Sequence, residues 1–208
     1  MAELTSPLTA RIGLNRTESL VDRLKEGDEA AFEEVFGLYK DMVYGLAFRL
    51  LADKADAMDV SQDVFLTLYR KIRQFRGDCA LKTWLYRVTL NQAANRNRWW
   101  KRRKKDRTFS LGLGNGSDEA IPIEPGCGRP GQDHQLYSQE LQQALQKSLK
   151  DLTFDQRAAV ILRDVQGLTY EEIAQLLNSE LGTIKSRIAR GRERLRRLLQ
   201  PYNEGMPL

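Results

Sequence analysis

The chain has 208 residues, of which 41% are hydrophobic and 29% are charged, and its formal net charge is +5. This length suits one domain or two small ones, and the composition favours small helical modules with much surface relative to core. Two cysteines, Cys79 and Cys127, and the single histidine His134 exclude a zinc site at the usual ligand spacings and a disulfide-rich secreted scaffold.

The amino-terminal residues predict neither a signal peptide nor a membrane anchor. Residues 1 to 17 are polar, contain Pro7 and Gly13, and lack an apolar stretch. No run of about 18 apolar residues occurs in the chain, so no membrane insertion is expected. We therefore expect a flexible tail at residues 1–17 and a cytoplasmic protein with reduced thiols.

Hydrophobic periodicity predicts four helices in the amino-terminal half. The first ends at Gly27, and Asp28 can cap the second, which carries a broad apolar stripe. The chain is then expected to turn over residues 53–59. The apolar stripe of the second helix is expected to comprise Ala31, Phe32, Val35, Phe36, Tyr39, Val43, Leu46, Ala47 and Leu50.

The third and fourth helices follow this turn. A turn at Phe75 to Asp78 separates the third helix from a long fourth one, expected from about Leu81 to Lys104, whose carboxyl half is polar and basic. The buried residues of the third helix are expected to be Val60, Val64, Phe65, Leu68, Tyr69 and Ile72. Those of the fourth are expected to be Trp84, Leu85, Val88 and Ala93.

Residues 107–132 are rich in glycine, proline and serine and show no periodicity. A segment of this composition is predicted to be a flexible linker. Two amphipathic helices are expected after it, at residues 136–149 and 154–165. No strand-like alternation of useful length occurs, so the fold class expected is all-α.

Leu168 to Leu199 predicts a helix-turn-helix with a basic second helix. Thr169 can cap the first helix, and Glu172 stands where a capping box requires it. Between Lys185 and Arg197 there are seven cations and only the acid Glu193. A solvated amphipathic helix is the alternative, but such a face usually mixes its charges, so this pattern favours a helix that enters the DNA major groove.

A second basic cluster lies on the long fourth helix. Residues 96–107 (RNRWWKRRKKDR) hold eight cations and one acid. Two separated basic clusters indicate a polyanionic partner that is contacted in two places.

Four motifs occur in a fixed order along the chain. They are Asp59–Phe65 (DVSQDVF), Phe75–Asp78 (FRGD), Thr83–Val88 (TWLYRV) followed by Asn91, and Leu168–Ala174 (LTYEEIA) with Gly182–Arg187 (GTIKSR). In this order, with the linker before the last motif, they resemble the extracytoplasmic-function (ECF) sigma factors of bacterial RNA polymerase. The resemblance covers residues 18 to about 200.

The resemblance implies two small helical domains joined by the flexible linker, the second containing the helix-turn-helix. The expected segments are a sigma region 2 domain at 18–106, a linker at 107–133, a sigma region 4 domain at 134–201 and a carboxy-terminal tail at 202–208. Such a protein binds core polymerase, directs it to promoters and helps to open the minus-ten element. The implied partners are the clamp coiled coil of the largest subunit, the flap of the second-largest subunit, promoter DNA as duplex and as single strand, and an anti-sigma factor.

The upstream duplex element is expected to be read from the second helix of the helix-turn-helix. Lys185, Ser186 and Arg190 are predicted to face bases. Arg187 is predicted to face a base or a phosphate, and Arg192 a phosphate or solvent.

The minus-ten strand is expected at the loop that starts at Phe75 and along the helix after it. Asn91 matches the base-contacting position of the family, although a plain exposed amide is the alternative; Asn95 and Arg98 follow on the same face. Trp99 can stack on a base or pack the helix end. The predicted contacts to this strand are Phe75, Asn91, Asn95, Arg98, Trp99, Lys101 and Arg102.

The third helix is expected to bind core polymerase through an acidic rim with an apolar centre. The same acids also favour their own helix amino terminus, and the two roles are compatible. The predicted contacts are Asp56, Asp59, Gln62, Asp63, Phe65 and Leu66.

No catalytic residue, metal site or cofactor is predicted, because the sequence has no Ser/His/Asp set, phosphate loop or metal cluster. Two alternatives remain open at the level of sequence. One is a helix-turn-helix regulator of duplex DNA whose amino-terminal half senses a signal or dimerises. The other is a nucleic-acid-processing enzyme, which is disfavoured because no clustered carboxylates fall near the basic faces.

Overall fold

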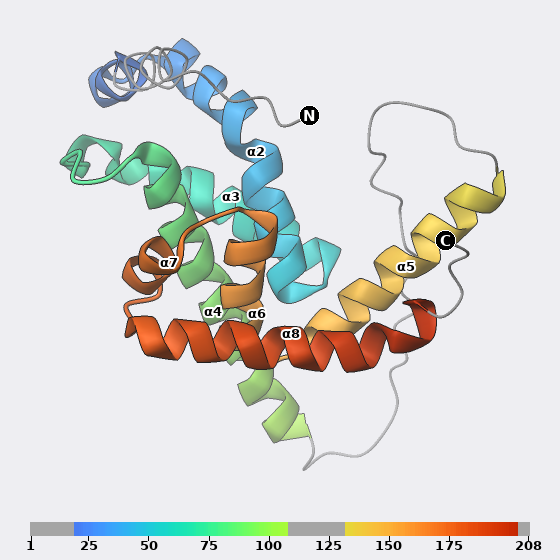
Figure 1. The fold of residues 1–208 in the computed structure, drawn as a ribbon. Coiled ribbons are helices and arrows are strands. Elements are labelled where there is room, and N and C mark those ends of the chain that lie inside the picture. Colours follow the sequence, from blue (N-terminus) through green and yellow to red (C-terminus); the bar gives the residue numbers. More distant parts are fainter. Residues whose placement is uncertain (1–18, 108–131, 204–208) are drawn as a thin grey trace, which may run out of the picture. The chain divides into compact units, whose positions relative to one another are not determined.

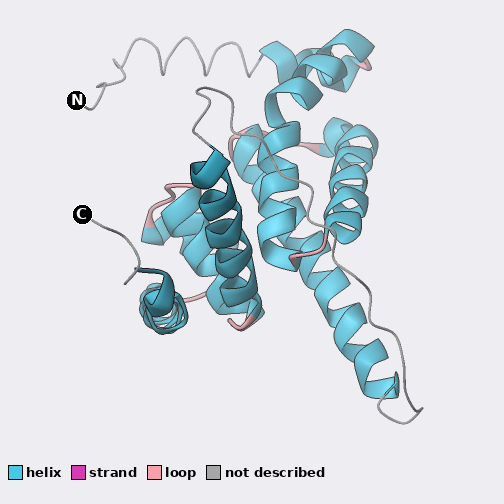
Figure 2. Cartoon of the chain, turned by 90° about the vertical axis from the view of Figure 1, so that its right-hand side faces the viewer, coloured by secondary structure: helices cyan, strands magenta, loops and turns pink. Residues whose placement is uncertain are grey.

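The computed structural model of the protein describes residues 19–107 and 132–203, all of them in helices or short turns, with no strand among them (Figures 1 and 2). The all-α fold is thus confirmed. The predicted amino-terminal tail, nearly all of the predicted linker and residues 204–208 of the predicted carboxy-terminal tail lie outside the described residues. The start of that tail is misplaced, because α8 (Leu181–Asn203) continues through residues 202 and 203. No helix in the described ranges is both long enough and apolar enough to cross a membrane.

The helices form two compact units, and the first contains the helices up to about the middle of α4. Its first helix, residues 19–26, ends before Gly27, which has φ +88°. Asp28 then caps α2 (Glu29–Leu51): its Oδ1 accepts the backbone N–H of Ala30 at 2.9 Å and that of Ala31 at 3.3 Å. The predicted cap is confirmed.

Helix α3 (Lys54–Lys71) begins earlier than the sequence suggests. Ala52, with φ +52°, reverses the chain, and the Oδ1 of Asp53 accepts the N–H of Asp56 at 2.8 Å. An aspartate at the N-cap satisfies one of the free donors of the first turn. The prediction of a turn over residues 53–59 is therefore wrong, because the cap of Asp53 starts the helix at once.

The core of the first unit lies between α2, α3 and α4 (Leu81–Arg107). Two aromatic residues predicted to be buried are instead exposed: Tyr69 at 65% and Phe36 at 43%. Each ring makes an edge-to-face contact, Tyr69 with Phe32 at 5.8 Å and Phe36 with Phe65 at 4.7 Å between ring centroids. The buried side chains on these helices include Val35, Val43, Leu46, Leu50, Val60, Val64, Leu68, Leu81, Leu85, Tyr86 and Leu90.

The second unit is built around α5 (Gln132–Lys150), α6 (Phe154–Val160), α7 (Tyr170–Leu176) and α8 (Leu181–Asn203), coloured yellow to red in Figure 1. Helix α6 opens with a capping box in which Thr153 and Gln156 exchange side-chain and backbone bonds. The core of the second unit comprises Leu149, Leu152, Ala158, Ala159, Ile161, Leu162, Ile173, Ile184 and Ile188.

Helix α6 continues into a π-helical turn, η2 (Ile161–Val165). The N–H of Gln166 bonds to the carbonyl of Ile161 at 3.1 Å, five residues back, and Gly167 follows with φ +72°. A π turn holds one residue more than an α turn and often marks a functional segment. It leads directly into the helix-turn-helix.

Helices α6 and α8 meet at Gly191. A Cβ atom there would lie 2.6 Å from the Cγ2 of Val160, closer than two carbon atoms can approach. The absent side chain allows the axis of α8 to lie close against α6.

Candidate nucleic-acid interface

The helix-turn-helix consists of α7, a short turn and α8. Thr169 caps α7 through the predicted box: its Oγ1 accepts the N–H of Glu172 at 3.2 Å, and Glu172 accepts the N–H of Thr169 at 2.7 Å. Asn178 takes a left-handed conformation with φ +45° in the turn. The hydroxyl of Ser179 donates to the carbonyl of Leu177 at 3.1 Å.

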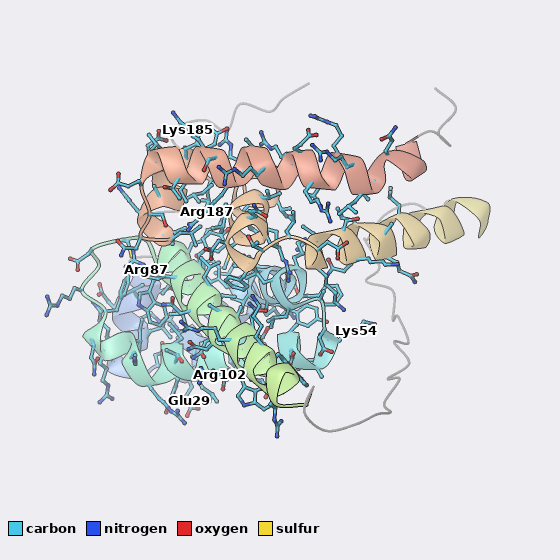
Figure 3. The ribbon with its side chains drawn as sticks, turned by 90° about the horizontal axis from the view of Figure 1, so that it is seen from below. Glu29, Lys54, Arg87, Arg102, Lys185 and Arg187 are labelled. Atoms are coloured by element: carbon cyan, nitrogen blue, oxygen red, sulfur yellow. The ribbon has the colours of Figure 1, made fainter. Side chains whose placement is uncertain are left out.

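Helix α8 buries one face and exposes the opposite one. Ile184 and Ile188 are fully buried, whereas Lys185 and Arg190 are exposed. Ser186 is half-buried, and its hydroxyl donates to the carbonyl of Thr183 at 2.9 Å. Figure 3 shows Lys185 on the outer side of α8 and Arg187 on the side that faces α6. The three residues predicted to face bases thus share a surface that solvent or a groove can reach.

Two other predicted contacts, Arg187 and Arg192, lie at the flanks of α8 and bond to their own unit. Arg187 forms an ion pair with Asp155, and Arg192 forms one with Asp164. The pKa of the Arg192 guanidinium is raised above its usual value, chiefly by the hydrogen bond to the Asp164 carboxylate. These guanidinium groups are therefore engaged within the protein itself.

Tyr170, at the start of α7, lies between the cations of this surface. The guanidinium of Arg163 is 4.7 Å from the centre of its ring, and the Nζ of Lys185 is 5.9 Å from it. Cation–π contacts at such distances contribute about 0.5–1 kcal/mol at exposed sites. Tyr170 therefore links Lys185 to the first helix of the motif, a role that the sequence analysis missed.

The amide and guanidinium groups predicted on α4 lie on one exposed face. Asn91, Asn95 and Arg98 are all exposed, and Arg98 donates to the Oδ1 of Asn95. This face therefore offers hydrogen-bonding groups over two helical turns, as base recognition on a separated strand requires.

Trp99 stands within a basic environment at the exposed end of this face. The guanidinium carbons of Arg96 and Arg103 lie 5.5 and 4.2 Å from the centre of its ring, and the ring of Trp100 lies 4.9 Å away. Lys101 and Arg102 are exposed beside it (Figure 3 labels Arg102). An aromatic ring among cations is suited to stack on a base while the cations neutralise phosphates.

Phe75, at the predicted strand-binding loop, is only half-buried. It follows the short 3-10 helix η1 (Ile72–Gln74), and its N–H bonds to the carbonyl of Ile72 at 3.0 Å. Its ring lies 6.2 Å from that of Trp84 in an edge-to-face arrangement. The packing against Trp84 holds Phe75 next to the first turn of α4.

Most of the predicted polymerase contacts lie exposed on α3. Asp59, Gln62, Asp63 and Leu66 are exposed, whereas Phe65 is buried against Phe36. Asp56 does not join this surface, because it is only 5% exposed at the capped start of α3. Exposed Met58, Tyr69 and Phe36 extend the apolar part of the surface instead.

Two family descriptions match the chain in succession. Sigma-70 region 2 matches residues 35–107, and Sigma-70, region 4 matches residues 142–195. The RNA polymerase sigma-H factor of Pseudomonas aeruginosa is 33% identical over 187 residues, covering 88% of this chain and 94% of that protein. The ECF RNA polymerase sigma-E factor of Escherichia coli strain K12 is 35% identical over 185 residues, covering 88% and 93%.

The chain belongs to the extracytoplasmic-function sigma factors.

A solved structure shares the fold of this sigma factor. It is the sigma factor RpoE of Bartonella quintana in complex with the anti-sigma factor NepR, with a TM-score of 0.62 and 28% identity, covering 81% of this chain and 96% of that chain. CnrH, solved with the cytosolic domain of CnrY, shares the fold at a TM-score of 0.62 and 19% identity, covering 89% of this chain and 97% of that chain.

The predicted site residues of this sigma factor all fall within the two matched regions. Those from Asp56 to Arg102 lie in region 2, and those from Lys185 to Arg192 lie in region 4. Among the described residues, no group of three or more histidine, cysteine or acidic side chains is placed to hold a metal ion.

Proposed function

We propose that this sigma factor binds core RNA polymerase, directs it to specific promoters and helps to open the minus-ten element. The observation that carries the proposal is the succession of regions 2 and 4 in one chain that resembles ECF sigma factors over 88% of its length. In this role the protein performs no chemical step of its own, acts in the cytoplasm beside the polymerase, and requires no cofactor.

The upstream element is bound as duplex by α8. Lys185 and Arg190 are exposed and can donate to base edges in the major groove, where pairing of a basic side chain with guanine is the commonest specific contact. Ser186 uses its proton on the carbonyl of Thr183 and keeps an oxygen that can accept from a base amino group.

The minus-ten element is bound as a separated strand by α4 and the loop before it. Asn91, Asn95 and Arg98 supply hydrogen bonds, and Trp99 supplies a stacking surface. Phe75 lies at the base pocket, while Lys101 and Arg102 hold phosphates without regard to sequence.

The exposed acids and apolar side chains of α3 bind the clamp coiled coil of the largest polymerase subunit. Asp59, Asp63 and Gln62 form its polar part, and Leu66 with the neighbouring Met58 forms its apolar part. Acids around an apolar centre complement a basic helical surface. Region 4 binds the flap of the second-largest subunit.

An anti-sigma factor regulates the protein. The support is the similarity to the RpoE structure that contains the anti-sigma factor NepR. Such a partner would prevent core polymerase binding by covering the surface around Asp59 and that around Lys185.

Run-off transcription with core polymerase tests the proposal. Templates from a genomic library of the native host should give discrete transcripts that require the protein, and Arg190→Gln and Asn91→Ala should each reduce their yield. The matched control is Lys40→Gln, which removes an exposed cation on α2 that is not among the proposed DNA contacts. Absence of any protein-dependent transcript from the library would contradict the proposal.

The competing function is that of a helix-turn-helix regulator. DNA binding by the same protein preparation, with and without core polymerase, distinguishes the two functions. A regulator binds a duplex operator tightly on its own, whereas a sigma factor binds specifically only with core polymerase. High-affinity, sequence-specific binding by the isolated chain, together with no effect on initiation, would establish the regulator.

A further inference from the structure

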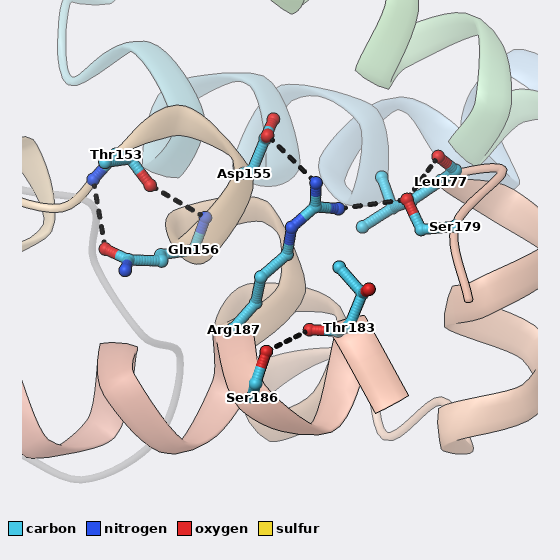
Figure 4. A network of polar contacts seen from close by, with 8 residues as sticks. All are labelled: Thr153, Asp155, Gln156, Leu177, Ser179, Thr183, Ser186 and Arg187. Atoms are coloured by element: carbon cyan, nitrogen blue, oxygen red, sulfur yellow. Dashed lines mark hydrogen bonds and ion pairs between the residues drawn. The ribbon is translucent and has the colours of Figure 1, made fainter. Parts of the chain in front are cut away.

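Arg187 bonds to two other parts of its own unit (Figure 4). From the second turn of α8, its Nη1 donates to the hydroxyl of Ser179 at 3.0 Å, in the turn before that helix. Its Nη2 pairs with the Oδ2 of Asp155 at 3.2 Å, in the first turn of α6. The side chain is 26% exposed, so it lies between these elements and not out in solvent.

Local bonds hold the two segments that carry these acceptors. The hydroxyl of Ser179 donates to the carbonyl of Leu177, and its backbone N–H bonds to the carbonyl of Ala174 at 3.0 Å. Asp155 follows the capping box of Thr153 and Gln156 that starts α6. Arg187 thus connects α8 to two firm points, the turn of the motif and the start of α6.

Arg192 makes a similar connection on the other flank of α8. Its Nε donates to the Oδ2 of Asp164 at 3.1 Å, and its Nη2 donates to the other carboxylate oxygen. Asp164 belongs to the π-helical turn that ends α6. Since Arg187 and Arg192 are five residues apart, they lie about 140° apart around the helix, with the buried Ile184 and Ile188 between them.

We propose that Arg187 and Arg192 are positioning residues that hold α8 in its rotation about its own axis, and that they do not read the promoter. This inference rests on the proposed function, because it concerns how α8 is presented to DNA. Each guanidinium forms directed bonds to a carboxylate, a geometry that lysine cannot reproduce. Rotation of α8 in either direction stretches one of the two pairs, so Lys185, Ser186 and Arg190 keep their direction.

Substitution of the acid partner Asp155 provides the sharpest test. The two possible roles of Arg187 predict opposite changes in the affinity for promoter DNA. If Arg187 positions α8, Asp155→Asn weakens promoter binding, although it removes a negative charge. If Arg187 contacts a phosphate, Asp155→Asn releases the guanidinium and leaves binding unchanged or tighter. The probe is a duplex selected from random DNA by the wild-type chain in complex with core polymerase, and its dissociation constant is measured over a series of KCl concentrations.

For positioning, Arg187→Gln and Asp155→Asn should each raise the dissociation constant about three- to tenfold, and the double variant should be no weaker than the weaker single variant. Arg187→Lys should behave like Arg187→Gln. The slope of the logarithm of the dissociation constant against log [KCl] should stay at the wild-type value. Loss of a phosphate contact would instead make the slope shallower by about 0.9 per contact.

The same set of single and double variants is made for Arg192→Gln and Asp164→Asn on the other flank of α8, with the same expected results. A slope shallower by about one for Arg187→Gln, with Asp155→Asn neutral or tighter, would overturn the inference. If the wild-type holoenzyme selects no duplex, the proposed function fails, and positioning is then decided by urea unfolding of the full chain. There, Arg187→Gln and Asp155→Asn should lower the midpoint non-additively, and strict additivity would overturn the inference.

Discussion

Tyr86 is a side chain of α4 whose environment has a measurable consequence. It is only 1% exposed, and burial, with a smaller contribution from the charge of Tyr39, raises its pKa to about 12. Its neutral form is therefore favoured in the folded protein. The stability that this provides is complete below the ordinary tyrosine pKa of about 10 and is lost as pH rises toward 12.

An absorbance titration of the phenolates checks this expectation. The chain has seven tyrosines, and the variant Tyr86→Phe retains six of them. The titration curve of this variant should lack the most alkaline step of the wild-type curve. Urea unfolding should also show a smaller loss of stability between pH 10 and 11.5 in this variant than in the wild type. Identical titration curves for the two proteins would contradict the assignment.

Contacts between residues close in sequence could be predicted, whereas contacts between residues far apart in sequence could not. The capping box of Thr169 and Glu172 is visible because its partners are three residues apart. The bond between Arg187 and Asp155 joins residues 32 positions apart, and nothing in a helical pattern indicates which of several acids an arginine will meet. The sequence therefore predicts the cations of α8 but not which of them are already paired.

Gly191 determines how closely α6 and α8 can pack. Because a Cβ there would lie 2.6 Å from the Cγ2 of Val160, Gly191→Ala should destabilise the protein by about 1–3 kcal/mol, despite the better helix propensity of alanine. Chemical denaturation measures the change in the free energy of unfolding.

Gly182 is the matched control on the same helix. A Cβ at Gly182 would meet nothing within 4 Å, so Gly182→Ala should leave stability unchanged or raise it by up to about 1 kcal/mol. Equal destabilisation by both substitutions would show that the close approach at Val160 is not the cause.

The existence of the main helices follows from hydrophobic periodicity, but their ends depend on single residues. The start of α3 differs from the predicted one because Asp53, which the sequence pattern places in a turn, is the N-cap of the helix. The buried faces were predicted well where aliphatic residues repeat. They were predicted poorly for Tyr69 and Phe36, because an aromatic ring can pack by one edge and remain largely exposed.

For the whole molecule, the division of DNA recognition between two regions predicts that they can be impaired separately. In complex with core polymerase, Arg190→Gln should weaken binding of an upstream duplex fragment about tenfold and leave binding of a minus-ten single strand unchanged. Asn91→Ala should do the reverse. Competition binding with the two fragments measures both effects.

Lys40→Gln again serves as the charge-matched control and should change neither fragment's affinity. Parallel losses for both fragments in either test variant would indicate that the two regions do not act as separate readers. The order of the four motifs was sufficient to predict two regions and their family, because each motif marks a different part of the chain. It could not give the exposure of individual contacts, as the burial of Asp56 shows.

The π-helical turn at Ile161–Val165 has a consequence for insertions and deletions. One residue more or less in a helix changes the angular phase of everything after it by about 100°. Deleting a single residue from this turn would restore an α turn. Helices α7 and α8 would then follow α6 at a different angle around its axis. The number of residues in this turn therefore sets the direction in which α8 is presented to duplex DNA.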